Sequence, residues 1–212
     1  PAFAEVQNVK VSGDIDSKLI VRNQYDFSNG NSQNTQPGVA SYQDGDSWFM
    51  SAVRVQIDAD LTDNVSTSIR LLNERDWDME AATTTEIDID LASVKLKEMF
   101  YAPLTLTIGR QNIRLGSGLV VGDPDTNDTA VGNANIVAND LSVRKAFDAV
   151  KATLDYNPLT VDLIMAKIDA NVIGRSTTTT RVNDDINLYA VNAAYKFNQY
   201  NSEAEAYFVT KD

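Results

Sequence analysis

The sequence predicts an all-β protein whose strands form an antiparallel, up-and-down transmembrane β-barrel, and three observations predict it. Apolar and polar residues alternate with a period of two along about nine segments. Short turns and long loops alternate between these segments, and aromatic residues gather near the segment ends. Because lipid cannot pair the open edge of a sheet, such a sheet must close with its apolar face outward and its charged face around an aqueous lumen.

A soluble β-sandwich is the competing explanation for two-faced strands. Its hidden face is a core, and nothing in that architecture makes the connections alternate in length. Bacterial single-chain barrels have an even number of strands, so we expect about nine strands here to be part of a larger barrel. A barrel of about 16–18 strands is wide enough for an aqueous channel.

The longest alternation comes first, over residues 9–27, where Val9, Val11 and Ile15 oppose Lys10 and Asp14. Each later segment shows the same period, which indicates a strand rather than a helix. The other predicted strands are residues 48–61, 65–77, 87–97 (with a phase change near 91–92), a fifth beginning at 104 within the stretch 104–122, then 146–156, 159–168, 186–197 and 202–209.

The fifth strand has a second phase change, at Gly109. A glycine at such a position is typical of a β-bulge, which redirects the side chains that follow. We therefore expect Ile113 and Leu115 on the apolar face, and Arg110 and Arg114 on the polar face.

Composition excludes several classes of function. The chain has 212 residues, with Lys+Arg 18 against Asp+Glu 30, and a formal net charge of -12. No basic excess is available to neutralise phosphates, so we expect no nucleic-acid partner. Without cysteine or histidine, thiolate metal sites and Ser-His or Cys-His catalysis are impossible in this segment. We expect no enzyme and no resident cofactor.

The first residues indicate export. Ala2-Phe3-Ala4 fits the small-x-small site cleaved by signal peptidase. Residues 1–4 are therefore expected to be the end of a signal peptide, and residues 5–212 the N-terminal part of a single transmembrane β-barrel domain. The expected location is the outer membrane of a Gram-negative bacterium.

Two segments resemble one known family. The stretch LTLTIGRQNIRLGSGLVVGDP, with RKAFDAVKATLDY beyond the long loop, resembles the alginate-export family of outer-membrane porins. The resemblance implies a barrel of about 18 strands, with a polar, partly arginine-lined constriction that passes an anionic polysaccharide. The residues that carry it are Gly109, Arg110, Gln111, Arg144, Phe147 and Asp148.

Arginines on the polar side of the strands are the candidate pore-lining residues. At a constriction they would select anions. The alternative is that they pair with carboxylates on neighbouring strands and hold the wall in place. The acidic composition leaves the cargo open under either interpretation. The candidates are Arg22, Arg54, Arg70, Arg110 and Arg114.

The longest loop, residues 117–145, carries two further hypotheses. Its closely spaced oxygen ligands could bind Ca²⁺, although the EF-hand pattern is absent and a solvated acidic turn is the alternative. The candidate ligands are Asp123, Asp125, Asn127 and Asp128. The loop also has apolar residues to bury, which favours an ordered segment that narrows the lumen. These apolar residues are Ile136, Val137 and Leu141.

Together these features predict an outer-membrane porin or export channel that passes small hydrophilic solutes or an anionic polysaccharide through a polar lumen. Its expected partners are outer-membrane lipid, that solute or polysaccharide, and other envelope proteins. The alternative is a non-transporting, β-rich cell-surface scaffold or adhesion protein. Ion conductance in a lipid bilayer distinguishes the two.

Overall fold

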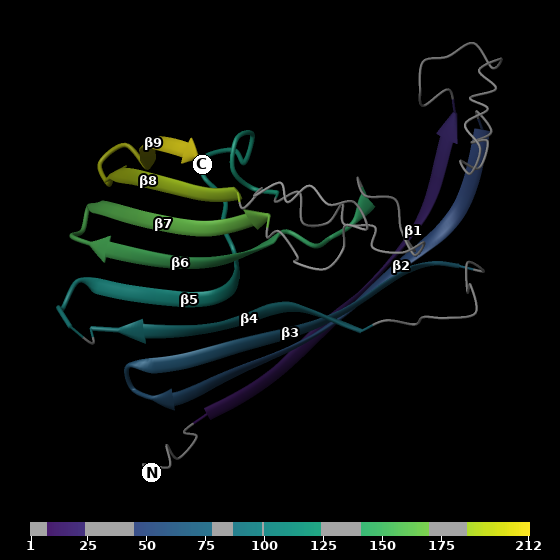
Figure 1. The fold of residues 1–212 in the computed structure, drawn as a ribbon, viewed down its shortest axis with the longest axis horizontal. Helices are drawn as coiled ribbons and strands as arrows, with labels where there is room; N and C mark the ends of the chain where they lie inside the picture. The colour runs from purple at the N-terminus through teal and green to yellow at the C-terminus, as the bar shows by residue number, and fades with distance from the viewer. Residues whose placement is uncertain (1–7, 24–44, 78–86, 99, 124–140, 170–185) are drawn as a thin grey trace, which may run out of the picture.

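The computed structural model describes residues 8–23, 45–77, 87–98, 100–123, 141–169 and 186–212. These residues form one antiparallel sheet of nine strands in the order β1 to β9, and they contain no α-helix (Figure 1). The strands are β1 (Asn8–Asn23), β2 (Gly45–Thr62), β3 (Val65–Asp76), β4 (Asp88–Lys97), β5 (Leu104–Asn112), β6 (Ala146–Asp155), β7 (Leu159–Asp169), β8 (Ile186–Phe197) and β9 (Ser202–Lys211).

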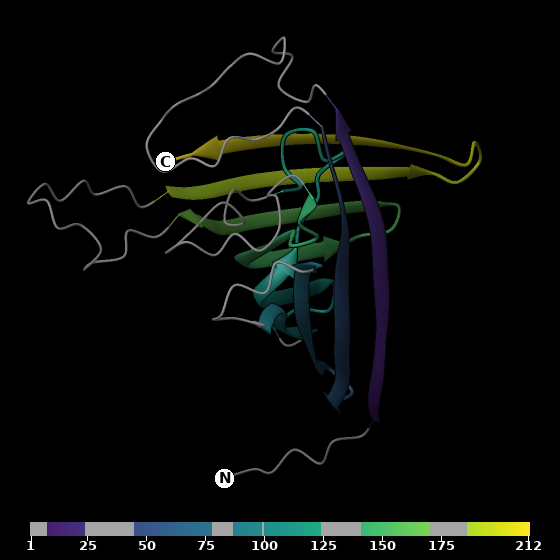
Figure 2. The same cartoon turned by 90° about the vertical axis from the view of Figure 1, so that its right-hand side faces the viewer.

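The topology is up-and-down, because every strand pairs with the next one along the chain. β1 and β9 are the two edges, and the sheet is open between them. Strong twist turns β1 and β2 steeply away from β8 and β9 (Figure 2). The predicted all-β, antiparallel, up-and-down arrangement is confirmed.

The alternation of connection lengths is also confirmed. At one end of the sheet the connections are short: residues 63–64, 98–103, 156–158 and 198–201. At the other end they are residues 24–44, 77–87, 113–145 and 170–185. We call these the turn end and the loop end of the sheet.

Alternating side chains give the sheet two chemically different faces. The cross-strand register places apolar residues of neighbouring strands opposite one another, as in the row Val11, Ile57, Ile69. This side of the sheet is the apolar face. The other side is the polar face, which carries Asp14, Arg54, Arg70, Lys95, Lys151 and Asn192.

The phase change in β4 is a β-bulge. Arg70 pairs with Leu91 and Leu71 pairs with Ile89, so Asp90 is an extra residue on β4. The sequence places this change near residues 91–92, and the structure places it one residue earlier.

The prediction of a β-bulge at Gly109 is wrong. Ser93, Gly109 and Ala149 pair in continuous register across β4, β5 and β6. Gly109 has a φ of +112°, and a Cβ there would lie 2.2 Å from the carbonyl oxygen of Ala92. The glycine therefore serves a close backbone approach, and no residue is inserted.

Because the register does not shift at Gly109, the side chains after it point to the faces opposite to those expected. β5 ends at Asn112 rather than continuing toward residue 122. Unbroken register keeps Arg110 on the same face as Ile108, whose partner is Val150. Ile113 instead follows Gln111 and is buried on the polar side, at 3% exposure. The expectation that Ile113 and Leu115 lie on the apolar face is therefore wrong.

Candidate functional site

Two of the candidate arginines on the polar face of β1 to β4 form ion pairs with carboxylates of neighbouring strands. The guanidinium of Arg54 on β2 donates to both carboxylate oxygens of Asp14 on β1, with Nη2 2.6 Å from Oδ2 and Nε 3.1 Å from Oδ1. Arg70 Nε on β3 lies 2.5 Å from Oδ2 of Asp90, the bulge residue of β4. These pairs support the interpretation that the arginines hold the wall together.

The two pairs differ in their surroundings. The Asp14 side chain is 53% exposed, and such a pair contributes at most about 1 kcal/mol. The Asp90 side chain is 1% exposed, so loss of Arg70 would leave a buried carboxylate without its ion-pair partner. The bulge thus turns Asp90 into a buried partner for Arg70.

The remaining arginine candidates do not form one belt with Arg54 and Arg70. The guanidinium carbon of Arg22 lies 5.2 Å from the ring centroid of Trp48, a cation–π contact on the polar face. Arg110 lies on the apolar face, where it pairs with Asp148 at 3.3 Å. The expectation that Arg110 shares a face with Arg54 is wrong, because the register through Gly109 does not shift.

Arg114 lies beyond the end of β5. Its Nη2 donates to the backbone carbonyl of Ser117 at 2.5 Å, and its side chain packs beside Gly118. Arg114 thus fastens a local turn on the connection between β5 and β6.

That connection folds back over the polar face of the sheet. Ile113, Leu115 and Val121 are buried, and they pack against apolar residues that occupy polar-face positions of the strands. The strand residues of this cluster are Phe147, Ala149, Ile164, Ala166, Leu188 and Ala190. In Figure 1 the segment rises from β5 past β6, β7 and β8 toward β9.

A hydrogen bond ties the far end of this segment to β9. The backbone N–H of Gly116 donates to Oε1 of Glu205 at 2.9 Å, and Gly116 also lies against the ring of Tyr207. Gly116 has a φ of +56°, which glycine adopts without strain. Residues 113–123 are called the covering segment below.

The returning part of the connection reaches the opposite side of the polar face. Glu74 on β3, only 6% exposed, accepts from the backbone N–H of Val143 at 2.5 Å and from the hydroxyl of Ser142 at 2.9 Å. Arg144 pairs with Glu74 and with Asp88 on β4. The described ends of the connection therefore contact β3, β4 and β9 on one face.

The predicted calcium ligands are only partly within the described residues. Asp123 pairs with Lys145, which joins the two ends of the connection. Asp125, Asn127 and Asp128 lie outside the described residues, as do Ile136 and Val137. Among the described residues, no group of three or more carboxylates is arranged to hold a metal ion. Leu141, the third apolar loop residue, is half-buried.

Five of the six residues that carry the family resemblance, all except Arg144, lie where β5 pairs with β6. Arg110 pairs with Asp148, and Gln111 pairs with Phe147. The Gln111 amide donates to three backbone carbonyls, those of Thr107, Gly109 and Ala149, at 3.1–3.2 Å. These residues fasten the start of the covering segment to β6, which is a structural role.

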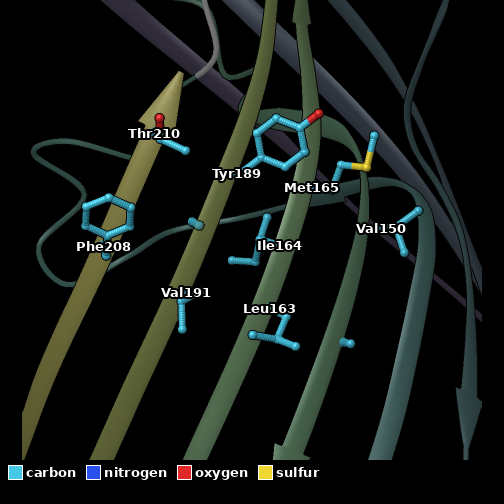
Figure 3. A pocket seen from close by; sticks show the side chains of 10 residues that line it. Val150, Leu163, Ile164, Met165, Tyr189, Val191, Phe208 and Thr210 are labelled. Carbon is cyan, nitrogen blue, oxygen red and sulfur yellow. The ribbon is translucent and has the colours of Figure 1, made fainter. Parts of the chain in front are cut away.

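The apolar face has no protein layer on it among the described residues. Each strand exposes at least one large apolar side chain there, with exposed fractions between 39% and 74%. One such residue per strand, from β1 to β9, is Ile15, Val55, Ile69, Ile89, Ile108, Val150, Leu163, Val191 and Phe208. A shallow apolar groove of about 420 Å³ crosses β6 to β9 on this side (Figure 3).

Aromatic side chains border the apolar residues at both ends of the strands. Near the loop end Phe49 stacks on Trp77 with ring centroids 4.9 Å apart. Near the turn end the ring centroids of Tyr195 and Phe197 lie 4.8 Å apart, and Tyr156 lies in the turn between β6 and β7. The described residues contain no helix that is long and apolar enough to cross a membrane.

Two groups of residues hold the connection against the sheet, and this role was not predicted from the sequence for either group. Glu74 and Glu205 bind the connection, but nothing in their sequence neighbourhood marks them. Phe147, Ile164 and Leu188 do carry a signal, because they are apolar residues at polar-face positions of the alternation. Apolar residues on the wrong face of a strand predict that something covers them.

Comparison with known proteins adds no family assignment. No family model matches the chain, and no curated protein matches it.

Proposed function

We propose that this protein is a channel-forming β-barrel of the bacterial outer membrane, a porin or an export channel. The observation that carries the proposal is the pair of opposite faces: large apolar side chains are exposed on every strand, and charged side chains lie on the other side of every strand except β5. In water such an apolar surface is costly. Against lipid it is favourable, and the charged face then borders water.

Further features support the same function. The strands are 9–18 residues long, and a transmembrane β-strand needs about 9–11 residues. Aromatic residues at both ends of the strands are typical of the two membrane interfaces. Short turns at one end and long connections at the other are typical of outer-membrane barrels.

Closure of the barrel is part of the proposal. Lipid offers no hydrogen bonds, so the free edges of β1 and β9 must be paired inside a membrane. β1 and β9 run in the same direction, since an even number of reversals separates them. Fully antiparallel closure therefore requires an odd number of further strands between them, consistent with a total of about 16–18 strands.

The solutes proposed for this channel are small hydrophilic molecules or an anionic polysaccharide. The resemblance to alginate-export porins supports the polysaccharide. The ion pairs of Arg54 and Arg70 argue against attributing anion selection to these arginines, because their charge is compensated locally.

The test is ion conductance of the whole protein, with the strands that close the sheet, purified in detergent and added to a planar lipid bilayer. Discrete conductance steps and a heat-modifiable mobility on gels are expected. A protein that stays soluble without detergent and leaves the bilayer silent would reject the channel and favour the surface scaffold.

A further inference from the structure

Three lysines on the polar face differ from the arginines around them. Lys95 and Lys97 lie on β4 and Lys151 lies on β6. The register aligns Lys95 with Thr107 on β5 and Thr107 with Lys151, so two of the lysines flank one threonine. Lys95, Lys97 and Lys151 are called the lysine patch.

The lysines of the patch are not paired with carboxylates among the described residues. Arg54, Arg70, Arg110 and Arg144 each form an ion pair with a carboxylate. Within the described part of the chain, the side chains of the three patch lysines form no ion pair and no hydrogen bond. The cations of this face that remain available to a ligand are thus lysines, not the arginines expected from the sequence.

The spacing suits one ligand. Adjacent strands lie about 4.8 Å apart, so the backbones at Lys95 and Lys151 are about 10 Å apart, while Lys95 and Lys97 are about 7 Å apart along β4. Side chains with a flexible four-carbon stem close such gaps readily. Three ammonium groups can therefore converge on a single small molecule above Thr107.

Carboxylates lie next to the lysine patch but form no ion pair with its ammonium groups. Asp60 on β2 is separated from Lys95 by Ser66, and it shares a small polar hollow at the turn end with Asp63 and Lys97. Asp162 on β7 lies diagonally from Lys151, and it accepts a hydrogen bond from the hydroxyl of Thr153 at 2.5 Å. These acids lie on either side of the strip from β4 to β6 that carries the three lysines.

We propose that the lysine patch is a binding site for a small multivalent anion that carries carboxylate or phosphate groups. This inference rests on the proposed function, because the patch meets solute only if the polar face lines an aqueous lumen. The site lies beside the area that the covering segment occupies, since Ile164, the β7 partner of Lys151, belongs to the covered cluster. An anion passing the covering segment would therefore meet these lysines.

The test is calorimetric titration of the full chain in detergent, at low ionic strength, with citrate and separately with pyrophosphate. The double variant Lys95→Gln/Lys151→Gln is expected to bind at least about tenfold more weakly, since two close charges are lost. Lys18→Gln is the control: it also removes a polar-face lysine, but one paired with Asp16 at 2.8 Å. Its affinity should stay within about twofold of the parent. Heat-modifiable mobility checks that each variant folds.

Bilayer recordings separate this proposal from the channel itself. A conducting protein whose affinity for both anions survives in the double variant, or that binds neither anion, overturns the site and leaves the channel. A protein that loses anion binding in the double variant but never conducts supports the site and rejects the channel. Tighter binding of citrate than of pyrophosphate identifies carboxylate as the preferred group, and the reverse order identifies phosphate.

Discussion

Gly116 donates its backbone N–H to Oε1 of Glu205 at 2.9 Å, although 89 residues separate the two in the chain. Gly116 belongs to the covering segment, and Glu205 lies on β9. The bond therefore fixes the covering segment to β9, so that the segment crosses the polar faces of β6, β7 and β8. In the proposed channel this contact keeps the covering segment between the polar faces of these strands and the lumen.

Glu205→Ala is expected to loosen the covering segment. A hydrogen bond to a charged acceptor contributes about 1.5–3 kcal/mol, less when it is exposed. Amide hydrogen exchange in residues 113–121 should accelerate by about tenfold. Glu203→Ala, a substitution on the same face of β9, should leave exchange there unchanged. Equal exchange in both variants would show that the apolar cluster alone holds the segment.

Glu74→Gln is expected to lower the free energy of unfolding by about 2 kcal/mol, because a buried charged acceptor of several hydrogen bonds becomes a neutral amide. Denaturant unfolding in detergent micelles, followed by tryptophan fluorescence, measures the change. Glu98→Gln, at an exposed turn between β4 and β5, is the matched control. A change below about 0.5 kcal/mol in Glu74→Gln would contradict the proposed anchoring of the returning segment.

Gly109→Ala is expected to cost about 2 kcal/mol or more. The added Cβ would lie 2.2 Å from the Ala92 carbonyl oxygen, at a φ of +112° that alanine rarely adopts. The temperature at which the folded band disappears from heat-modifiable gels should fall. An unchanged transition would mean that β4 and β5 can separate locally at no cost.

Ala152 and Thr153 are consecutive residues of β6 that point to opposite faces. Ala152→Arg places a charge on the apolar face and is expected to cost about 2–4 kcal/mol if that face meets the middle of a bilayer. Thr153→Arg places the same side chain on the polar face, beside Asp162, and should be tolerated. The yield of folded protein in lipid vesicles measures both. Equal yields would contradict the assignment of the apolar face to lipid.

Alternation along each segment was enough to predict nine strands and their order, with most boundaries within a few residues. This works because the direction of side chains in a strand repeats every two residues, which is a local property of the backbone. The alternating connection lengths and the aromatic residues at strand ends were predicted for the same reason: they can be read along the chain without knowing which residues touch.

The tertiary structure decided three further features. They are the register through Gly109, the ion pairs of Arg54 and Arg70, and the path of the covering segment. A glycine at a phase change fits either a bulge or a close approach to a neighbouring strand, and only the position of Ala92 distinguishes them. The partner of each arginine depends on which carboxylate the register brings beside it. The sequence alone determined a two-faced sheet; contacts between distant residues decided which cations on it are neutralised and which part of it is covered.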